Sequence, residues 1–279
     1  MRGRVVAITG GAQGIGLATA QACAAAGMTV AIGDIDATMA ADAAAGLGGT
    51  AVGLAVDVSD PVSFAAFIDE TERRLGPLDV LVNNAGIFVG GVFAEQDPAA
   101  IERLLAVNIA GVLHGTRLAL DRFGPRGEGH IVNLASSGGL LAVAGAATYC
   151  ATKHAVVGFT RSLRAELHGT GVRTTIVCPG HINTQMTSGF SKLPGVRVLE
   201  PSEVGDAIVA ALRSCREEVV VPAELGAVVR MRALLPQRAG DAMFRAGGGD
   251  RLILGGDKSA QAKYARSVAA ANTSDGSHA

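Results

Sequence analysis

A regular alternation of short apolar runs with helix-length segments, continuing through residue 222, limits the fold more than any other feature of this sequence. The short runs are rich in β-branched residues, which is typical of parallel strands buried on both faces. We predict seven strands, at 4–9, 29–34, 50–57, 78–84, 129–136, 172–179 and 217–222. Between them we predict helices at 14–26, 61–75, 98–121, 149–169 and 201–214. This order predicts one α/β domain, a doubly wound parallel sheet with helices on both faces.

The residues after 222 break this pattern and form a C-terminal extension. Residues 223–254 mix apolar side chains with five arginines and predict one or two amphipathic helices. We therefore divide the chain into a core at 1–222, a helical extension at 223–266 and a disordered tail at 267–279. We expect the extension to pack on the core or to form a subunit contact; the alternative is a helix on a membrane surface.

Composition excludes several classes of protein. Hydrophobic residues make up 49% of the chain and charged residues 18%, which is enough for a buried core. A formal net charge of −1 without a basic block gives no electrostatic footprint for nucleic acid. No secretory signal and no apolar run of membrane-spanning length is evident, so we expect a cytoplasmic protein without integral membrane contact. The four cysteines are scattered, and we expect reduced thiols and no metal site.

Glycines follow the first predicted strand in the stretch TGGAQGIG, residues 9–16. Gly10, Gly14 and Gly16 allow a tight turn in which the backbone approaches a pyrophosphate. The helix that follows offers free N–H groups and a favourable dipole to that anion. We include Gln13 and Ile15, which lie between these glycines, in the predicted dinucleotide site.

An acid ends the second predicted strand. The carboxylate of Asp34 can accept hydrogen bonds from the adenosine ribose and would repel the 2′-phosphate of NADP. No lysine or arginine stands beside it, since Gly33, Ile35 and Gln13 are uncharged. The sequence therefore predicts NAD in preference to NADP.

One of the two tyrosines, Tyr149, precedes Lys153 by four residues in a run of small side chains. On a helix this spacing places both on one face. The spacing alone distinguishes poorly between packing and chemistry.

Several motifs follow one another in a single order, and together they resemble the short-chain dehydrogenase/reductase family, in its subfamily of about 250 residues. They are TGGAQGIG, DV at 57–58, NNAG at 83–86, Asn108, Ser136, YCATK at 149–153 and PG at 179–180. The resemblance covers residues 4 to 222. It implies a Rossmann-like fold of seven strands, a nicotinamide cofactor, no metal, and a homodimer or homotetramer.

The resemblance also implies a role for each matching residue. Asp57 and Val58 would flank the adenine, and Asn84, Ala85 and Gly86 would close the cofactor wall. Pro179 and Gly180 would place Ile182 and Thr184 against the nicotinamide carboxamide. Asn108 would hold a water near Lys153, although an interior asparagine that caps a kink is the structural alternative.

The implied reaction needs a base, because hydride can leave an alcohol carbon only when the hydroxyl proton leaves too. Tyr149 is the predicted acid/base, with Ser136 bound to the substrate oxygen and Lys153 on the nicotinamide ribose. Lys153 and the positive nicotinamide ring would lower the pKa of Tyr149 by about 3 units, or roughly 4 kcal/mol.

The loop at about 184–200 contains Met186, Phe190 and Leu193 and few charges, so we expect a hydrophobic substrate such as a steroid, a lipid-like or a terpenoid alcohol. We expect an NAD(P)-dependent enzyme that acts on CH–OH groups. The alternatives are a 3-oxoacyl-type reductase and a protein that senses dinucleotides without catalysis.

Overall fold

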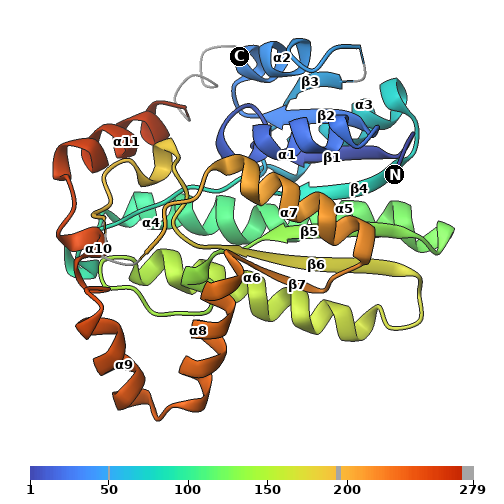
Figure 1. Cartoon of the computed structure of the whole chain (residues 1–279). Coiled ribbons are helices and arrows are strands. Elements are labelled where there is room, and N and C mark those ends of the chain that lie inside the picture. The colour runs from blue at the N-terminus through green and yellow to red at the C-terminus, as the bar shows by residue number, and fades with distance from the viewer. Residues whose placement is uncertain (50, 193–195, 272–279) are drawn as a thin grey trace.

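A computed structural model of the chain describes residues 1–49, 51–192 and 196–271. In these ranges the chain forms the predicted single sheet of seven parallel strands, and their order is β3-β2-β1-β4-β5-β6-β7 (Figure 1). The strands are β1 Val5–Thr9, β2 Thr29–Asp34, β3 Ala51–Ala55, β4 Leu78–Asn83, β5 Gly129–Leu134, β6 Val172–Pro179 and β7 Glu218–Val221.

Helices cover both faces of the sheet (Figure 1). Those of the core are α1 Gly14–Ala25, α2 Ala37–Ala45, α3 Pro61–Leu75, α4 Pro98–Leu105, α5 Gly111–Arg126, α6 Ala147–Glu166 and α7 Pro201–Ser214. Alternate residues of β1 enter different cores: Val6 and Ile8 pack with α1, α2 and α7, whereas Val5 and Ala7 pack with α3 and α5. This two-sided burial explains why a strand such as β1 is apolar along nearly its whole length.

Polar and proline residues start several helices where the sequence predicts. Asp60 accepts a hydrogen bond from Val62 N, and α3 begins at Pro61. The helix α7 likewise begins at Pro201. Proline fits the first turn because its missing N–H would have no partner there.

Two helical predictions were wrong in detail. The helix α2 was not predicted, because its alanine-rich sequence buries only Ala40 and Ala44 and so shows little apolar periodicity. The single helix predicted at 98–121 is α4 followed by a π-helical turn, Ala106–Ala110, and then α5, which continues to Arg126. Both parts share one helical period, so their sequence pattern does not reveal the wider turn.

The C-terminal extension forms α8 Ala223–Leu234, α9 Gln237–Ala246, α10 Arg251–Leu254 and α11 Lys258–Ala271. Figure 1 shows α8 and α9 projecting from the body as a hairpin, while α10 and α11 return to the end of the core near α4. The helix α11 continues past residue 267, where we predicted a disordered tail, and residues 272–279 lie outside the described ranges. None of the helices in the described part of the chain is both long and apolar enough to cross a membrane.

The strand order reverses between β1 and β4, which lie side by side at the centre of the sheet. In open α/β sheets, ligands bind in the crevice at the carboxyl ends of the strands around such a switch point. The residues predicted for the site follow β1, β2, β3, β4, β5 and β6, so the topology brings them to one edge.

Candidate functional site

The glycine turn lies between β1 and α1 and is braced by the end of β4. Gly10 and Gly14 have positive φ angles of 60° and 56°. A Cβ on Gly16 would collide with the carbonyl oxygen of Gly10. The side-chain nitrogen of Asn84 donates to the carbonyl oxygens of Thr9 and Gly10, both at 2.9 Å. Asn84 therefore fixes the turn to the neighbouring strand.

Thr9 is a structural residue of this turn that our prediction did not include. Its hydroxyl accepts hydrogen bonds from the backbone N–H groups of Asn84 and Ala85, both at 3.1 Å. The sequence signal that could have identified Thr9 is its position as the first residue of the TGGAQGIG stretch. Beyond it, Gln13 is exposed at the start of α1 and Ile15 packs against the core.

Asp34 lies beside the glycine turn. Its Oδ2 accepts a hydrogen bond from Ala12 N at 3.1 Å, and its Oδ1 accepts one from Asp36 N at 3.4 Å. Burial raises the pKa of this carboxyl, and the backbone hydrogen bonds oppose that shift. No cation is among the groups that shift its pKa. In the described part of the chain, the groups that act on the Asp34 carboxyl therefore include no positive charge.

The residues predicted to flank the adenine are held in different ways. Asp57 Oδ1 accepts hydrogen bonds from the N–H and the hydroxyl of Ser59, at 2.8 and 2.6 Å. The Val58 side chain is buried, and a Cβ on Gly111 would lie 2.9 Å from it, so this side chain sets how closely α5 approaches. The carbonyl oxygen of Val58 lies 3.2 Å from His114 Nδ1.

The structure brings Ser136, Tyr149 and Lys153 together. Ser136 follows β5, and its hydroxyl is hydrogen-bonded to Tyr149. Lys153 is buried on α6, where its Nζ donates to Leu134 O at 2.9 Å and lies 5.7 Å from the centroid of the Tyr149 ring. A Cβ on Gly139 would lie 2.6 Å from the Lys153 carbonyl oxygen. The absence of a side chain at Gly139 therefore lets α6 approach the segment after β5 closely.

Burial dominates the electrostatics of this group in the chain alone, without the positive nicotinamide ring that our prediction includes. In the chain alone, burial raises the pKa of Tyr149 to about 12, and the hydrogen bond with Ser136 only partly opposes this. Burial also lowers the pKa of Lys153 to about 8, so its ammonium is still mostly charged at neutral pH. Lys153 by itself therefore does not make the phenol acidic, because desolvation outweighs the attraction of one cation.

Asn108 lies in the π-helical turn and is fully buried. Its Nδ2 donates to Ile87 O at 2.9 Å and to Thr152 Oγ1 at 3.2 Å, and its Oδ1 accepts from Ile87 N at 2.9 Å. These bonds occupy the side chain, which matches the structural alternative of an asparagine at a kink. Both N–H donors of the Asn108 amide are used by these bonds, and its Oδ1 keeps one lone pair.

The segment after β6 completes this edge. Gly180 N donates to Val221 O at 2.7 Å, and Ile182 is buried in a bridge with Leu199. Thr184 begins a 3₁₀ turn, Gln185–Thr187, and a Cβ on Gly14 would lie 3.6 Å from its methyl group. Thr184 thus closes on the glycine turn, whereas Gly86 lies near Lys153 and Asn108.

Apolar side chains surround Tyr149 on the substrate side. The Phe88 ring packs edge-on against Tyr149 at 5.1 Å and against Phe190 at 5.0 Å. Met186 and Phe190 belong to this cluster, which supports their predicted place near the substrate; Leu193 lies outside the described residues. His181, which we left out of the site, packs 5.7 Å from Phe190, and its Nδ1 has no partner among the described residues.

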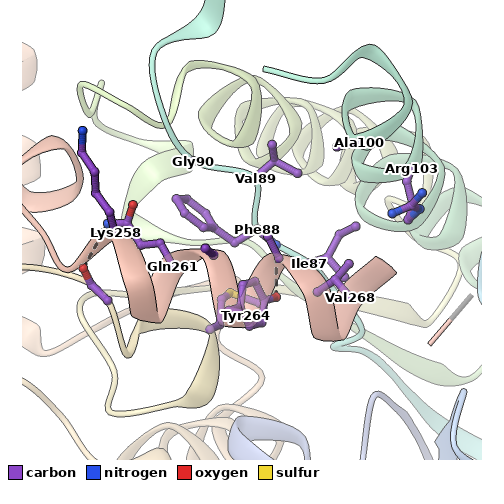
Figure 2. Close-up of a pocket in the computed structure, with 14 residues that line it drawn as sticks. Ile87, Phe88, Val89, Gly90, Ala100, Arg103, Lys258, Gln261, Tyr264 and Val268 are labelled. Atoms are coloured by element: carbon purple, nitrogen blue, oxygen red, sulfur yellow. Dashed lines mark hydrogen bonds between the residues drawn. The ribbon is translucent and has the colours of Figure 1, made fainter. Parts of the chain in front are cut away.

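A cavity of about 270 Å³ lies beyond Phe88, between the 87–90 segment, α4 and α11 (Figure 2). Its wall is mostly apolar, with Arg103 and Lys258 at its edges and Gln261 and Tyr264 on α11. Sequence reasoning missed Phe88, Ile253 and Tyr264, because their place depends on how the extension folds back. Within the described ranges, no group of three or more metal-ligating residues occurs.

Residues 4–193 match the family model described as short chain dehydrogenase. This match covers more than half of the chain, and the fold and the order of the site residues agree with it. The chain belongs to the short-chain dehydrogenase family.

Individual relatives are similar over most of this chain. It is 36% identical to "Probable oxidoreductase EphD" of Mycobacterium tuberculosis over 84% of its length, but it spans only 43% of that protein. It is 41% identical to "2-(S)-hydroxypropyl-CoM dehydrogenase 3" of Xanthobacter autotrophicus, covering 76% of this chain and 90% of that protein. A solved structure of a short chain dehydrogenase/reductase from Burkholderia phymatum, in complex with NAD, superposes with a TM-score of 0.77 at 27% identity, covering 83% of this chain and 93% of the other.

Proposed function

We propose that the chain is an NAD-dependent oxidoreductase that interconverts a secondary alcohol and a ketone. The observation that carries this proposal is the meeting of Ser136, Tyr149 and Lys153 beside a glycine turn at the carboxyl edge of the sheet. In the oxidation direction, the alcohol and NAD⁺ give the ketone, NADH and a proton. When bound, NAD⁺ supplies the hydride acceptor and a positive ring charge that favours the phenolate of Tyr149.

The residues at this edge fit a dinucleotide. The turn at Gly10, Gly14 and Gly16 has the tight backbone that phosphate groups can approach, and a Cβ on Gly16 would disrupt it by colliding with the carbonyl oxygen of Gly10. Asp34 stands where an adenosine ribose would lie, without a neighbouring cation, which favours NAD over NADP. Bound NAD in the Burkholderia phymatum relative supports the same choice.

Three side chains of this protein orient the substrate and transfer the proton. The Ser136 hydroxyl hydrogen-bonds and orients the substrate oxygen, and Tyr149 removes the alcohol proton. Because burial alone raises the pKa of Tyr149 to about 12, the phenol depends on positive charge around it. Lys153 supplies one such charge, held in place by its bond to Leu134 O.

The substrate is proposed to be hydrophobic around the reacting carbon. Phe88, Phe190 and Met186 form the wall around Tyr149, and the adjoining cavity is mostly apolar. Such a wall favours a steroid, lipid-like or terpenoid alcohol over a sugar, whose hydroxyl groups would lose their hydrogen bonds to water.

The test compares wild type with Tyr149→Phe on a panel of secondary alcohols, following NADH formation. We expect Tyr149→Phe to lower kcat at least about 100-fold, since it removes the general base. Calorimetry should show little change in NAD binding, because the Phe ring keeps the packing. Equal turnover by both proteins would exclude the mechanism, and turnover confined to small polyols would exclude the substrate class.

A further inference from the structure

The two tyrosines of the chain pack against the same buried cluster, although one belongs to the core and the other to the C-terminal extension. Tyr264 lies on α11 and packs in the same cluster as Tyr149, Phe88 and Ile253. The family model ends at residue 193, so Tyr264 lies outside the segment that it matches. The family's shared mechanism therefore assigns no role to this residue.

The hydroxyl of Tyr264 has an unused proton. Its oxygen accepts a hydrogen bond from Phe88 N at 3.3 Å (Figure 2). A phenol can accept and donate at once, and no acceptor for the Tyr264 proton occurs among the residues that the structure describes. Burial raises the pKa of Tyr264, and a negative charge on Tyr149 would raise it further, so this phenol stays protonated.

Phe88 links Tyr264 to the reacting centre. Its ring lies 5.1 Å from that of Tyr149, while its backbone N–H reaches the Tyr264 hydroxyl. Both Phe88 and Tyr264 also line the 270 Å³ cavity (Figure 2). Tyr264 thus lies at the boundary between the catalytic tyrosine and the space available to the rest of a substrate.

The surroundings of this hydroxyl are otherwise apolar. Ala146, Cys150, Ile253 and Phe88 are the buried members of the cluster. Tyr264 is half-buried and lines the cavity, so an oxygen on a ligand bound there could accept its proton. A site built in this way discriminates strongly against an analogue that lacks the matching group.

We propose that Tyr264 is a substrate-binding residue whose hydroxyl donates a hydrogen bond to a second oxygen of the substrate, close to the reacting carbon. The preferred substrates are then secondary alcohols or ketones that carry a neighbouring hydroxyl or carbonyl group on an apolar body. This inference rests on the proposed oxidoreductase function and adds a polar requirement to its hydrophobic substrate class.

The experiment compares wild type and Tyr264→Phe on matched pairs of substrates that differ by one oxygen, such as cyclohexanol with its 1,2- and 1,3-diols. Tyr264→Phe removes one hydroxyl and keeps the ring that packs against Ile253 and Phe88. We expect kcat/KM for the preferred diol to fall about fivefold to tenfold, mainly through KM, as for the loss of one hydrogen bond. The ratio of kcat/KM for the diol to kcat/KM for cyclohexanol should fall by the same factor.

Three outcomes would count against the proposal, and they are separable. An equal loss for both members of each pair would mean that Tyr264 only positions Phe88. If the wild-type protein has the same kcat/KM for cyclohexanol as for either diol, no second oxygen is bound. If wild type oxidises no alcohol in the panel, and Tyr149→Phe therefore changes nothing, the proposed function itself fails.

Discussion

At the scale of single residues, Asp34 makes a structural hydrogen bond and carries the charge on which the proposed preference for NAD rests. Its Oδ2 accepts the N–H of Ala12 and so helps to hold the glycine turn, while the charge of the carboxylate opposes a 2′-phosphate. An alanine at this position would remove both effects. Asparagine keeps a side-chain oxygen that can accept from Ala12 and removes only the charge.

We therefore predict that Asp34→Asn tightens NADP binding by about tenfold or more, which is about 1.4 kcal/mol. Binding of NAD should weaken only modestly, because one ribose hydrogen bond loses its charge assistance. Calorimetric titration with both dinucleotides measures the two affinities. Asp36→Asn is the matched control, since Asp36 is exposed, two residues away, and caps α2 through Met39 N. An unchanged ratio of NADP to NAD affinity in Asp34→Asn would contradict the role given to this charge.

At the scale of elements, the π-helical turn between α4 and α5 explains the burial of Asn108. The turn places its amide against both backbone groups of Ile87, just after the strand-end residues Asn84, Ala85 and Gly86. The bond to Thr152 then connects this turn to α6, on which Lys153 lies. Asn108 thus positions the loop after β4 relative to the catalytic helix.

For this reason Asn108→Ala should reduce stability as well as activity. The change leaves Ile87 N–H and C=O without their partner, and we expect the free energy of unfolding to fall by about 2–4 kcal/mol. Denaturant unfolding measures this value. As a control, Asn183→Ala removes an exposed amide that bonds to Glu200, and should change stability by less than about 0.5 kcal/mol. Normal stability in Asn108→Ala with lost turnover would indicate a purely catalytic asparagine.

Some helices, strands and site residues of this protein could be predicted from the sequence, and others could not. Every strand was predicted, because several of these parallel strands, buried on both faces, appear as nearly continuous apolar runs. The helix α2 was missed since alanines carry little periodic signal, and the π-helical turn was missed since it interrupts no apolar stripe. The motifs located Ser136, Tyr149 and Lys153, whereas Tyr264 reaches them only through tertiary folding of α10 and α11. The pKa of Tyr149 depends on burial, which no spacing of residues encodes.

At the scale of the whole molecule, the helices α1 and α7 join the two halves of the sheet. The helix α1 follows β1, α7 lies between β6 and β7, and both pack in one core on the same face. They approach so closely that a Cβ on Gly205 would lie 2.6 Å from the carbonyl oxygen of Ala18. Because α1 begins at the glycine turn, its position on α7 also sets the position of the dinucleotide site.

We predict that Gly205→Ala lowers the free energy of unfolding by about 1–3 kcal/mol, because backbone atoms of α1 cannot move aside as a side chain can. This loss should appear although alanine is the better helix former by about 0.5–1 kcal/mol. Gly158→Ala in α6 is the matched control, because no heavy atom of a neighbouring element lies within 4 Å of its added Cβ. This variant should raise the free energy of unfolding by about 0.5–1 kcal/mol. Denaturant unfolding and NAD titration of both variants test the prediction. If Gly205→Ala and Gly158→Ala raise the free energy of unfolding equally, α1 and α7 do not make the close contact at Gly205. If Gly205→Ala also weakens NAD binding, the packing of α1 on α7 determines the geometry of the glycine turn.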